Sequence, residues 1–115
     1  RGLSNTTTAR DLAVLMAAIA QGRAASDSSS AIMLDILTQQ EFRAGIPAGI
    51  PPGTRVASKT GNITGVNHDA AVIFPPARPP YVLVVLTRGF QSPGAAEAYM
   101  AAVSRAVWAG LVGVP

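Results

Sequence analysis

The sequence predicts an α+β fold, with two N-terminal helices, a three-stranded antiparallel sheet and a C-terminal helix packed on that sheet. Three observations lead to this prediction. The first half carries apolar residues at helical spacing, the second half switches to strand-like runs, and the links between the strands are short. Short links join antiparallel neighbours, because parallel strands need a long crossover. We therefore expect residues 1–115 to form one domain or part of one.

The first helix is predicted over Asp11–Gln21, after a polar, irregular segment at Arg1–Thr8. Thr8 and Asp11 have the spacing of a capping box, and Gly22 is a plausible stop. The apolar residues at helical spacing are Leu12, Leu15, Met16 and Ile19.

A second helix follows the small, polar linker Arg23–Ser30, with Asp27 or Ser28 as its N-cap. Its apolar stripe is predicted to be Ile32, Met33, Ile36 and Leu37, and its polar end Gln39, Gln40 and Glu41. Ala44–Gly53 contains Pro47, Pro51 and Pro52, which predicts an ordered loop without a helix.

Three strands come next. Thr54–Gly61 and His68–Phe74 are predicted as strands, joined by a turn at Asn62–Asn67 that contains Gly65. After a proline-rich turn, Tyr81–Arg88 gives the strongest strand signal. This run is almost wholly apolar and rich in valine, a composition typical of a strand buried on both faces.

The last helix is predicted from about Ala95 to Leu111, with Ser92 as cap and Pro93 as first residue. Tyr99 and Trp108 are expected in the core rather than at a ligand. One stripe contains Tyr99, Val103, Val107 and Leu111, while Glu97, Ser104 and Arg105 lie off it.

Composition narrows the functional classes. Hydrophobic residues make up 49% and charged residues 13%, enough apolar material for a core. The net charge of +3 comes from scattered arginines rather than a basic cluster, which disfavours a nucleic-acid binder. With no cysteine and one histidine, we expect no metal and no cofactor. No apolar run is long enough to span a membrane. The chain starts at Arg1, so we expect the natural start to be missing.

No self-contained active site is evident. A serine activated by lysine on a helix needs Ser-x-x-Lys, yet the single lysine, Lys59, is preceded by Val56 at that spacing. A Gly-x-Ser-x-Gly elbow does not occur either. His68 and Asp69 are neighbours on a strand, so their side chains would point to opposite faces. We therefore predict no catalytic residue in this chain.

A substrate anchor is a better prediction, at Ser58-Lys59-Thr60-Gly61. Lysine supplies positive charge, the threonine hydroxyl can donate to a carboxylate, and glycine lets a ligand lie against the strand edge. On the tripeptide alone, a strand end with a solvated lysine is the favoured interpretation.

The context of the tripeptide resembles a known family. Residues 54–90 read TRVASKTG, a turn, HDAAVIFPP, a proline turn and YVLVVLTRGF. This order is similar to the third, fourth and fifth sheet strands of class A β-lactamases and related penicillin-recognising serine hydrolases. Asn5–Leu12 resembles the exit of the family's Ω-loop and the helix after it, Pro47–Gly53 the loop leading into the third strand, and the last helix the C-terminal one.

The resemblance implies that the three strands are the C-terminal half of a five-stranded sheet. It assigns Lys59 to the substrate carboxylate and the Ser-Asp-Asn loop, Thr60 to a hydrogen bond with that carboxylate, and Gly61 to making room. The Asn62 backbone would donate to an oxyanion and accept from the substrate amide, and His68 would lie beside the carboxylate. The nucleophilic serine, its lysine, the Ser-Asp-Asn loop and the Ω-loop glutamate would all precede Arg1.

Several alternatives stay open. Many class A enzymes carry arginine where His68 stands, so the parent could instead be a cell-wall D-Ala-D-Ala peptidase or another serine hydrolase of this fold. A non-catalytic remnant that self-associates is the other hypothesis. The small-molecule partner would be a β-lactam or a peptidoglycan-like compound. Either the N-terminal half of the same protein or a second copy would cover Tyr81–Arg88, and the family implies a periplasmic or secreted protein.

Overall fold

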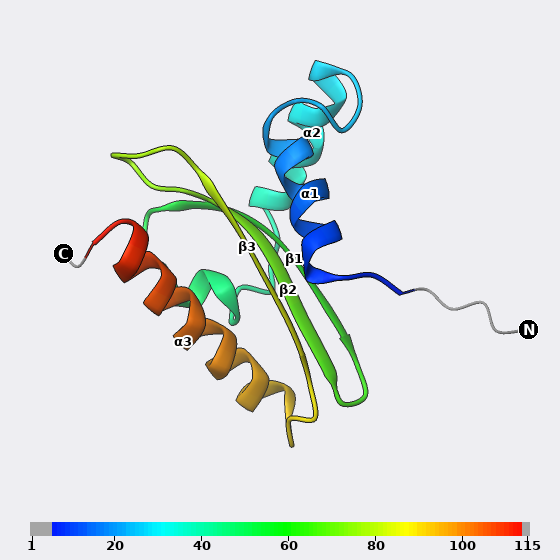
Figure 1. Ribbon diagram of the computed structural model, residues 1–115, viewed down its shortest axis with the longest axis vertical. Coiled ribbons are helices and arrows are strands. Elements are labelled where there is room, and N and C mark those ends of the chain that lie inside the picture. Colours follow the sequence, from blue (N-terminus) through cyan, green and yellow to red (C-terminus); the bar gives the residue numbers. More distant parts are fainter. Residues whose placement is uncertain (1–5, 114–115) are drawn as a thin grey trace, which may run out of the picture.

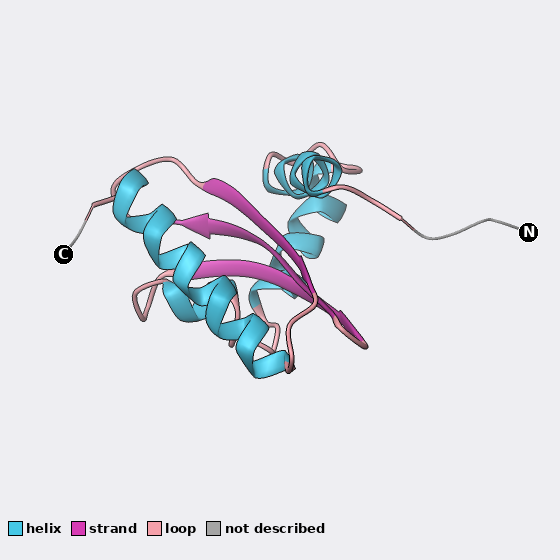
Figure 2. Ribbon diagram, turned by 60° about the horizontal axis from the view of Figure 1, so that its bottom comes forward, coloured by secondary structure: helices cyan, strands magenta, loops and turns pink. Residues whose placement is uncertain are grey.

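The fold, described for residues 6–113 by a computed structural model, consists of an antiparallel sheet between two helical layers. Its elements are α1 (Ala9–Ala20), α2 (Asp27–Thr38), the 3₁₀ turn η1 (Ile46–Gly49), β1 (Arg55–Ile63), β2 (Val66–Phe74), β3 (Tyr81–Arg88) and α3 (Pro93–Leu111). The strand order is β1-β2-β3. Helix α3 lies with η1 on one face, and α1 and α2 lie on the other (Figure 1, Figure 2). This confirms the α+β prediction, while Arg1–Asn5, assigned by resemblance to a loop exit, lie outside the described residues.

Serine and threonine side chains define where the helices begin. Thr8 Oγ1 accepts the Asp11 N–H at 3.0 Å, so the cap is confirmed and α1 begins at Ala9, two residues earlier than predicted. Ser92 caps α3 in the same way, and Pro93 is the first helical residue as predicted.

The cap predicted for α2 is wrong. Ser26, not Asp27 or Ser28, is the N-cap, and its Oγ accepts the Ser29 N–H at 3.1 Å. Asp27 therefore lies in the first turn, where its negative charge opposes the helix dipole favourably.

The β1–β2 hairpin is tighter than the sequence predicts. Strand β1 continues to Ile63 and β2 begins at Val66, which leaves a two-residue turn at Thr64–Gly65 in place of the predicted Asn62–Asn67. Gly65 has a φ of 73°, the left-handed region that two-residue hairpin turns require. The Lys-Thr-Gly motif is consequently inside a paired strand and not at its end.

Two apolar clusters hold the sheet between the layers. The cluster on the α3 side contains Ile46, Ile50, Val56, Ala71, Ile73 and Trp108. The cluster on the α1 side contains Met16, Ile19, Ala57, Ala70 and Val72. Strand β2 is buried along most of its length because it occupies the centre. The composition of Tyr81–Arg88 is typical of a strand buried on both faces, but within residues 6–113 β3 is an edge strand with its apolar side chains half-buried.

Helix α3 turns a different face to the core from the one predicted. Tyr99 is 50% and Leu111 49% exposed, whereas Ser104, predicted to lie off the stripe, is fully buried. The buried residues are Ala96, Met100, Ala101, Ser104 and Trp108. Trp108 thus lies in the core as expected, but Tyr99 packs on Phe90 at the surface with ring centroids 5.4 Å apart.

The close approach of η1 explains this choice of face. A Cβ on Gly49 would overlap the Ala101 carbonyl oxygen and lie 2.8 Å from the Arg105 nitrogen. Only small side chains on α3 allow backbone contact of this kind. The stripe of large apolar residues therefore did not predict the buried face of α3.

The predictions for α2 and the following loop also need correction. Ile32 is 61% and Ile36 56% exposed, Met33 is exposed as well, and only Leu37 of the predicted stripe packs toward the α1-side cluster. Ala44–Gly53 is not free of helix, since η1 forms within it. Pro47 is tolerated there because the first N–H groups of a helix have no internal partner.

Candidate functional site

The Lys-Thr-Gly segment lies where β1 leaves the cover of the helices. Val56, Ala57 and Ser58 are buried, whereas the strand from Lys59 onward is exposed or half-buried. Figure 1 shows the hairpin extending beyond α1 at this end of the sheet. Ser58, the serine next to Lys59, has a fully buried hydroxyl and does not reach the exposed part of the strand.

One hydrogen bond establishes the direction in which the backbone N–H and C=O groups of β2 point. The Gly89 N–H donates to the Gly65 carbonyl at 2.9 Å, so these residues face each other across β2 and β3. Backbone groups alternate in direction along an antiparallel strand. Those of Asn67 therefore point toward β3, and those of His68 point toward β1.

The same alternation orients the backbone of β1. Gly61 is paired with His68, so its backbone groups face β2, and those of Thr60 and Asn62 face away from the sheet. Lys59 Nζ donates to the Thr60 carbonyl at 2.6 Å, which agrees with a carbonyl directed outward. Within residues 6–113 no strand pairs with this outer edge of β1. The outer edge of β1 thus offers the backbone N–H and C=O groups of Thr60 and of Asn62, two residues apart.

Two cavities flank Gly61 on the α1 side of the sheet. One of about 330 Å³ is lined by Lys59, Gly61, His68 and apolar residues of α1. Another of about 550 Å³ is lined by Gly61, Asn62, His68 and Ile63, with Thr7 at its rim. No atom lies within 4 Å of the position that a Gly61 Cβ would take, so the glycine leaves open space.

A larger cavity, about 680 Å³, lies at the opposite end of the sheet beside Arg55, Phe74 and Trp108. It contains none of the predicted site residues. We take Lys59–Asn62 as the candidate site because charge, backbone donors and open space coincide there.

His68 and Asp69 project to opposite faces of β2, as the strand pattern predicts. His68 lies on the α1 side, where its Nδ1 accepts the Thr87 backbone N–H at 3.1 Å. Asp69 lies on the α3 side, where its Oδ2 accepts the Ile46 N–H at 2.9 Å. The two side chains therefore cannot act as one dyad.

Asp69 is a feature that the sequence reasoning missed. The side chain is 1% exposed and is paired across the ladder with Thr60. Burial raises the pKa of Asp69 to about 6, against the opposing effects of the Ile46 N–H and the positive charges of Arg43 and Lys59. A carboxylate in the middle of an apolar strand was the available signal.

The rest of the described chain adds no metal centre to this picture. Over residues 6–113, no group of three or more His, Cys, Asp or Glu side chains could hold a metal ion. No helix in the same range is long and apolar enough to cross a membrane.

The fold and the edge motif define a β-lactamase-like α+β unit. A family model described as the Beta-lactamase enzyme family matches residues 1–111, and the chain belongs to this family. The predicted resemblance is thereby confirmed.

Individual relatives agree with this assignment. A β-lactamase of Streptomyces lavendulae is 33% identical over 82 residues, which are 71% of this chain and 26% of that protein. The crystal structure of a β-lactamase from Sphaerobacter thermophilus superimposes with a TM-score of 0.90 at 33% identity, covering 99% of this chain and 44% of the other. PBP-A is similar at 34% identity and a TM-score of 0.85, over 96% of this chain and 42% of that one. The chain thus spans less than half the length of each.

Proposed function

We propose that this chain forms the substrate-binding half of a serine β-lactam hydrolase that works through an acyl-enzyme. The observation that supports the proposal most directly is the open edge of β1. There Lys59 is exposed, and the backbone groups of Thr60 and Asn62 point away from the sheet beside two cavities.

Each residue of the edge has a chemical role in this proposal. Lys59 supplies positive potential for the substrate carboxylate, and the Thr60 hydroxyl hydrogen-bonds it. Gly61 leaves room for the ligand to lie flat. The Asn62 N–H donates to the oxyanion that forms when the amide is attacked, and loss of such a donor costs about a hundredfold in rate.

The nucleophile belongs to residues outside this chain in our proposal. Lys59 is the single lysine in the sequence and has Val56 three positions before it, so no Ser-x-x-Lys pair occurs within these 115 residues. The serine, its lysine partner and the residue that primes the deacylating water would come from the remainder of the parent protein.

The test uses the full-length protein that carries this chain. We expect it to hydrolyse a chromogenic β-lactam and to show a transient covalent mass adduct on a serine outside this chain. Lys59→Ala should lower kcat/KM at least about tenfold, since about 1.4 kcal/mol of anion binding is lost. Arg78→Ala, a cation at the far end of the sheet, serves as control and should leave kcat/KM unchanged. Full-length protein that turns over no β-lactam would contradict the proposal.

A cell-wall peptidase is the second candidate, favoured by the similarity to PBP-A. A variant of that protein is described as an acyl-enzyme complex with penicillin G. A peptidase of this kind would cleave a peptidoglycan-stem peptide ending in D-Ala-D-Ala and would release the penicillin adduct slowly. Assaying the peptide beside the chromogenic β-lactam separates the two, and no adduct with either indicates a non-catalytic remnant.

We also propose that a strand from the remainder of the parent protein covers the outer edge of β3. Support comes from the length of the relatives, because the matched part is 44% of the Sphaerobacter structure. A second copy of the chain is the competing occupant. A periplasmic or secreted location is proposed with it, from the family alone.

A further inference from the structure

A buried carboxylate lies directly behind the Lys59–Asn62 edge. Asp69 on β2 is the ladder partner of Thr60 and is 1% exposed. Because the backbone groups of Gly61 and His68 face each other, the next pair, Thr60 and Asp69, is of the type without hydrogen bonds between its backbones. The Cα atoms of such a pair are about 4.5 Å apart, closer than in the hydrogen-bonded type. Only β1 therefore lies between the strand that carries this carboxylate and the candidate site.

The carboxylate is held in place from the η1 side. Its Oδ2 accepts the Ile46 N–H at 2.9 Å. A Cβ on Gly45 would lie 2.7 Å from the same oxygen and 3.4 Å from Met100 Cε, so the loop before η1 and helix α3 both close over the side chain. The carboxylate cannot turn out to solvent without disturbing this packing. A change in its charge thus takes place where water and salt screen it least.

Two cations act on this carboxylate: Arg43, in the loop before η1, and Lys59, on β1. Its neighbours from the other two elements carry no charge, since Val85 is its ladder partner on β3 and Met100 approaches from α3. The interaction with Lys59 is reciprocal, because one energy links the two charges. An ionised Asp69 therefore offsets part of the positive potential that Lys59 gives to the edge, and a protonated Asp69 does not.

We infer that the charge of Asp69 determines how strongly the Lys59–Asn62 edge prefers an anionic substrate to a neutral one. The inference rests on the proposed function of that edge. Burial raises the pKa of Asp69 to about 6, so both charge states of the side chain occur between pH 5 and pH 8. The ionised form repels a substrate carboxylate and leaves an ester unaffected. The parent protein should therefore prefer carboxylate substrates most strongly at the acidic end of this range.

The experiment measures kcat/KM for a chromogenic β-lactam and for its methyl ester on the full-length protein, from pH 5 to pH 8. The ratio of the acid over the ester cancels titrations that affect both compounds equally, such as those of the catalytic groups. We expect this ratio to fall at least about threefold as the pH rises past the pKa of Asp69. In Asp69→Asn, which has no charge to gain, the ratio should stay near its highest value at every pH.

Two further variants sharpen the test. His68→Gln is the matched control, because an imidazole on the opposite face of β2 can also change its charge in this pH range. The H68Q protein should keep the fall in the ratio. Arg43→Gln tests the inference without altering Asp69. It removes a charge that lowers the pKa of the carboxyl, so the fall should move to higher pH.

Four outcomes would overturn the inference: a ratio in the unmodified protein that does not change with pH, a fall that persists in D69N, a fall that is lost in H68Q, or an R43Q profile that matches the unmodified one. If D69N does not fold, the R43Q profile decides. Failure of the proposed function has a different signature, since the unmodified protein would then hydrolyse neither compound at any pH.

Discussion

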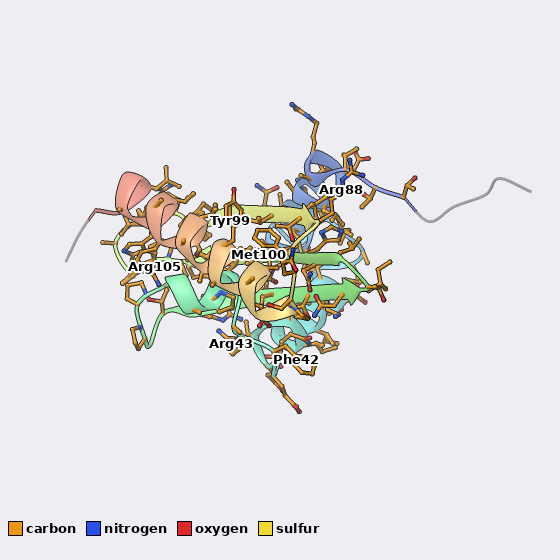
Figure 3. All side chains as sticks on the ribbon, turned by 90° about the horizontal axis from the view of Figure 1, so that it is seen from below. Phe42, Arg43, Arg88, Tyr99, Met100 and Arg105 are labelled. Carbon is orange, nitrogen blue, oxygen red and sulfur yellow. The ribbon has the colours of Figure 1, made fainter. Side chains whose placement is uncertain are left out.

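Asp69 shows how one side chain joins the two layers that meet behind the candidate site. Its carboxylate accepts the Ile46 N–H from η1, and its ladder partner Thr60 belongs to the exposed edge. Gly45 permits this contact, because a Cβ there would lie 2.7 Å from Asp69 Oδ2. Arg43 lies nearby at the β1 edge, opposite Arg88 at the β3 edge (Figure 3). A single carboxylate thus holds the loop before η1 against the sheet.

The raised pKa of Asp69 has a consequence for stability. The native state binds this proton more tightly than the unfolded chain, where the pKa is 3.8. The free energy of unfolding should therefore fall as pH rises from about 4 to about 6 and stay level above, by about 2–3 kcal/mol from this group. Asp69→Asn keeps a neutral acceptor for Ile46 and should remove that fall.

Denaturant titrations of the folded parent protein between pH 4 and pH 8 measure this effect. Asp35→Asn, at an exposed position on α2, is the control and should leave the pH profile unchanged. If D69N retains the full dependence on pH, another group causes it.

Among the contacts between elements, the packing of η1 on α3 was the one that the sequence pattern predicted least well. A pattern of large apolar residues predicted the wrong face of α3, because the buried face is made of alanine, serine and methionine around Trp108. The hydrophobic pattern predicted which segments are helices. It did not predict which face is buried, since that depends on how closely a glycine lets another backbone approach.

Gly49→Ala should therefore destabilise the fold strongly, by about 3 kcal/mol or more, because the new Cβ meets the α3 backbone rather than a flexible side chain. Gly110→Ala is the matched control on α3. No atom lies within 4 Å of its Cβ position, and alanine favours helix by about 1 kcal/mol. The two free energies of unfolding should change in opposite directions, and similar values would contradict the packing described.

The outer edge of β3 is the other exposed feature at this scale. The strand is apolar and half-exposed, and it has no proline or charge before Arg88, the devices that usually protect an edge. Because Asn67 points its backbone toward Thr87, the N–H of Val84 points outward and that of Val85 points toward β2.

A proline at each position separates edge pairing from folding. The isolated chain should self-associate in sedimentation and bind a hydrophobic dye. Val84→Pro should reduce association and keep the circular dichroism spectrum, because it removes only an outward N–H. Val85→Pro should unfold the sheet, at a cost of about 3 kcal/mol. A dilute, stable monomer that binds no dye would show that β3 needs no partner.

At the scale of the whole molecule, the sequence predicted the α+β fold class, the order of the elements and the position of the Lys-Thr-Gly motif. These features follow from local patterns, such as the spacing of apolar residues and the residues that cap helices. Ser92-Pro93 marked the start of α3, and the valine-rich run marked β3 to the residue. Burial could not be predicted in the same way. Ile32 and Ile36 have the spacing of a core stripe, but over residues 6–113 nothing covers them.

The candidate site was predicted unevenly for the same reason. The Lys59–Asn62 segment was identified from the motif and its context, and its chemical roles stay predictions. The Thr87–His68 bond joins residues 19 positions apart and depends on the register of β2 with β3, and the Ile46–Asp69 bond joins residues 23 positions apart and depends on where η1 meets the sheet. That register cannot be read from a single sequence.

The isolated chain gives a test that belongs to the whole molecule. Incubated with a fluorescent penicillin, the 115-residue chain should take up no label, because no Ser-x-x-Lys pair is present. The full-length parent in the same gel is the positive control. Label on a serine of the isolated chain would refute our view that the nucleophile lies elsewhere.

The contact between Gly49 and Ala101 also bears on how the chain reaches its fold. It joins η1 to the last described helix, so the chain must close a long loop before η1 and α3 can contact each other. Contacts of such separation slow folding, because the entropy of closure is lost before the contact energy is gained. During synthesis, the strands can pair while η1 still lacks its contact with α3. We therefore expect the α3-side core to be completed late, after the hairpins have formed.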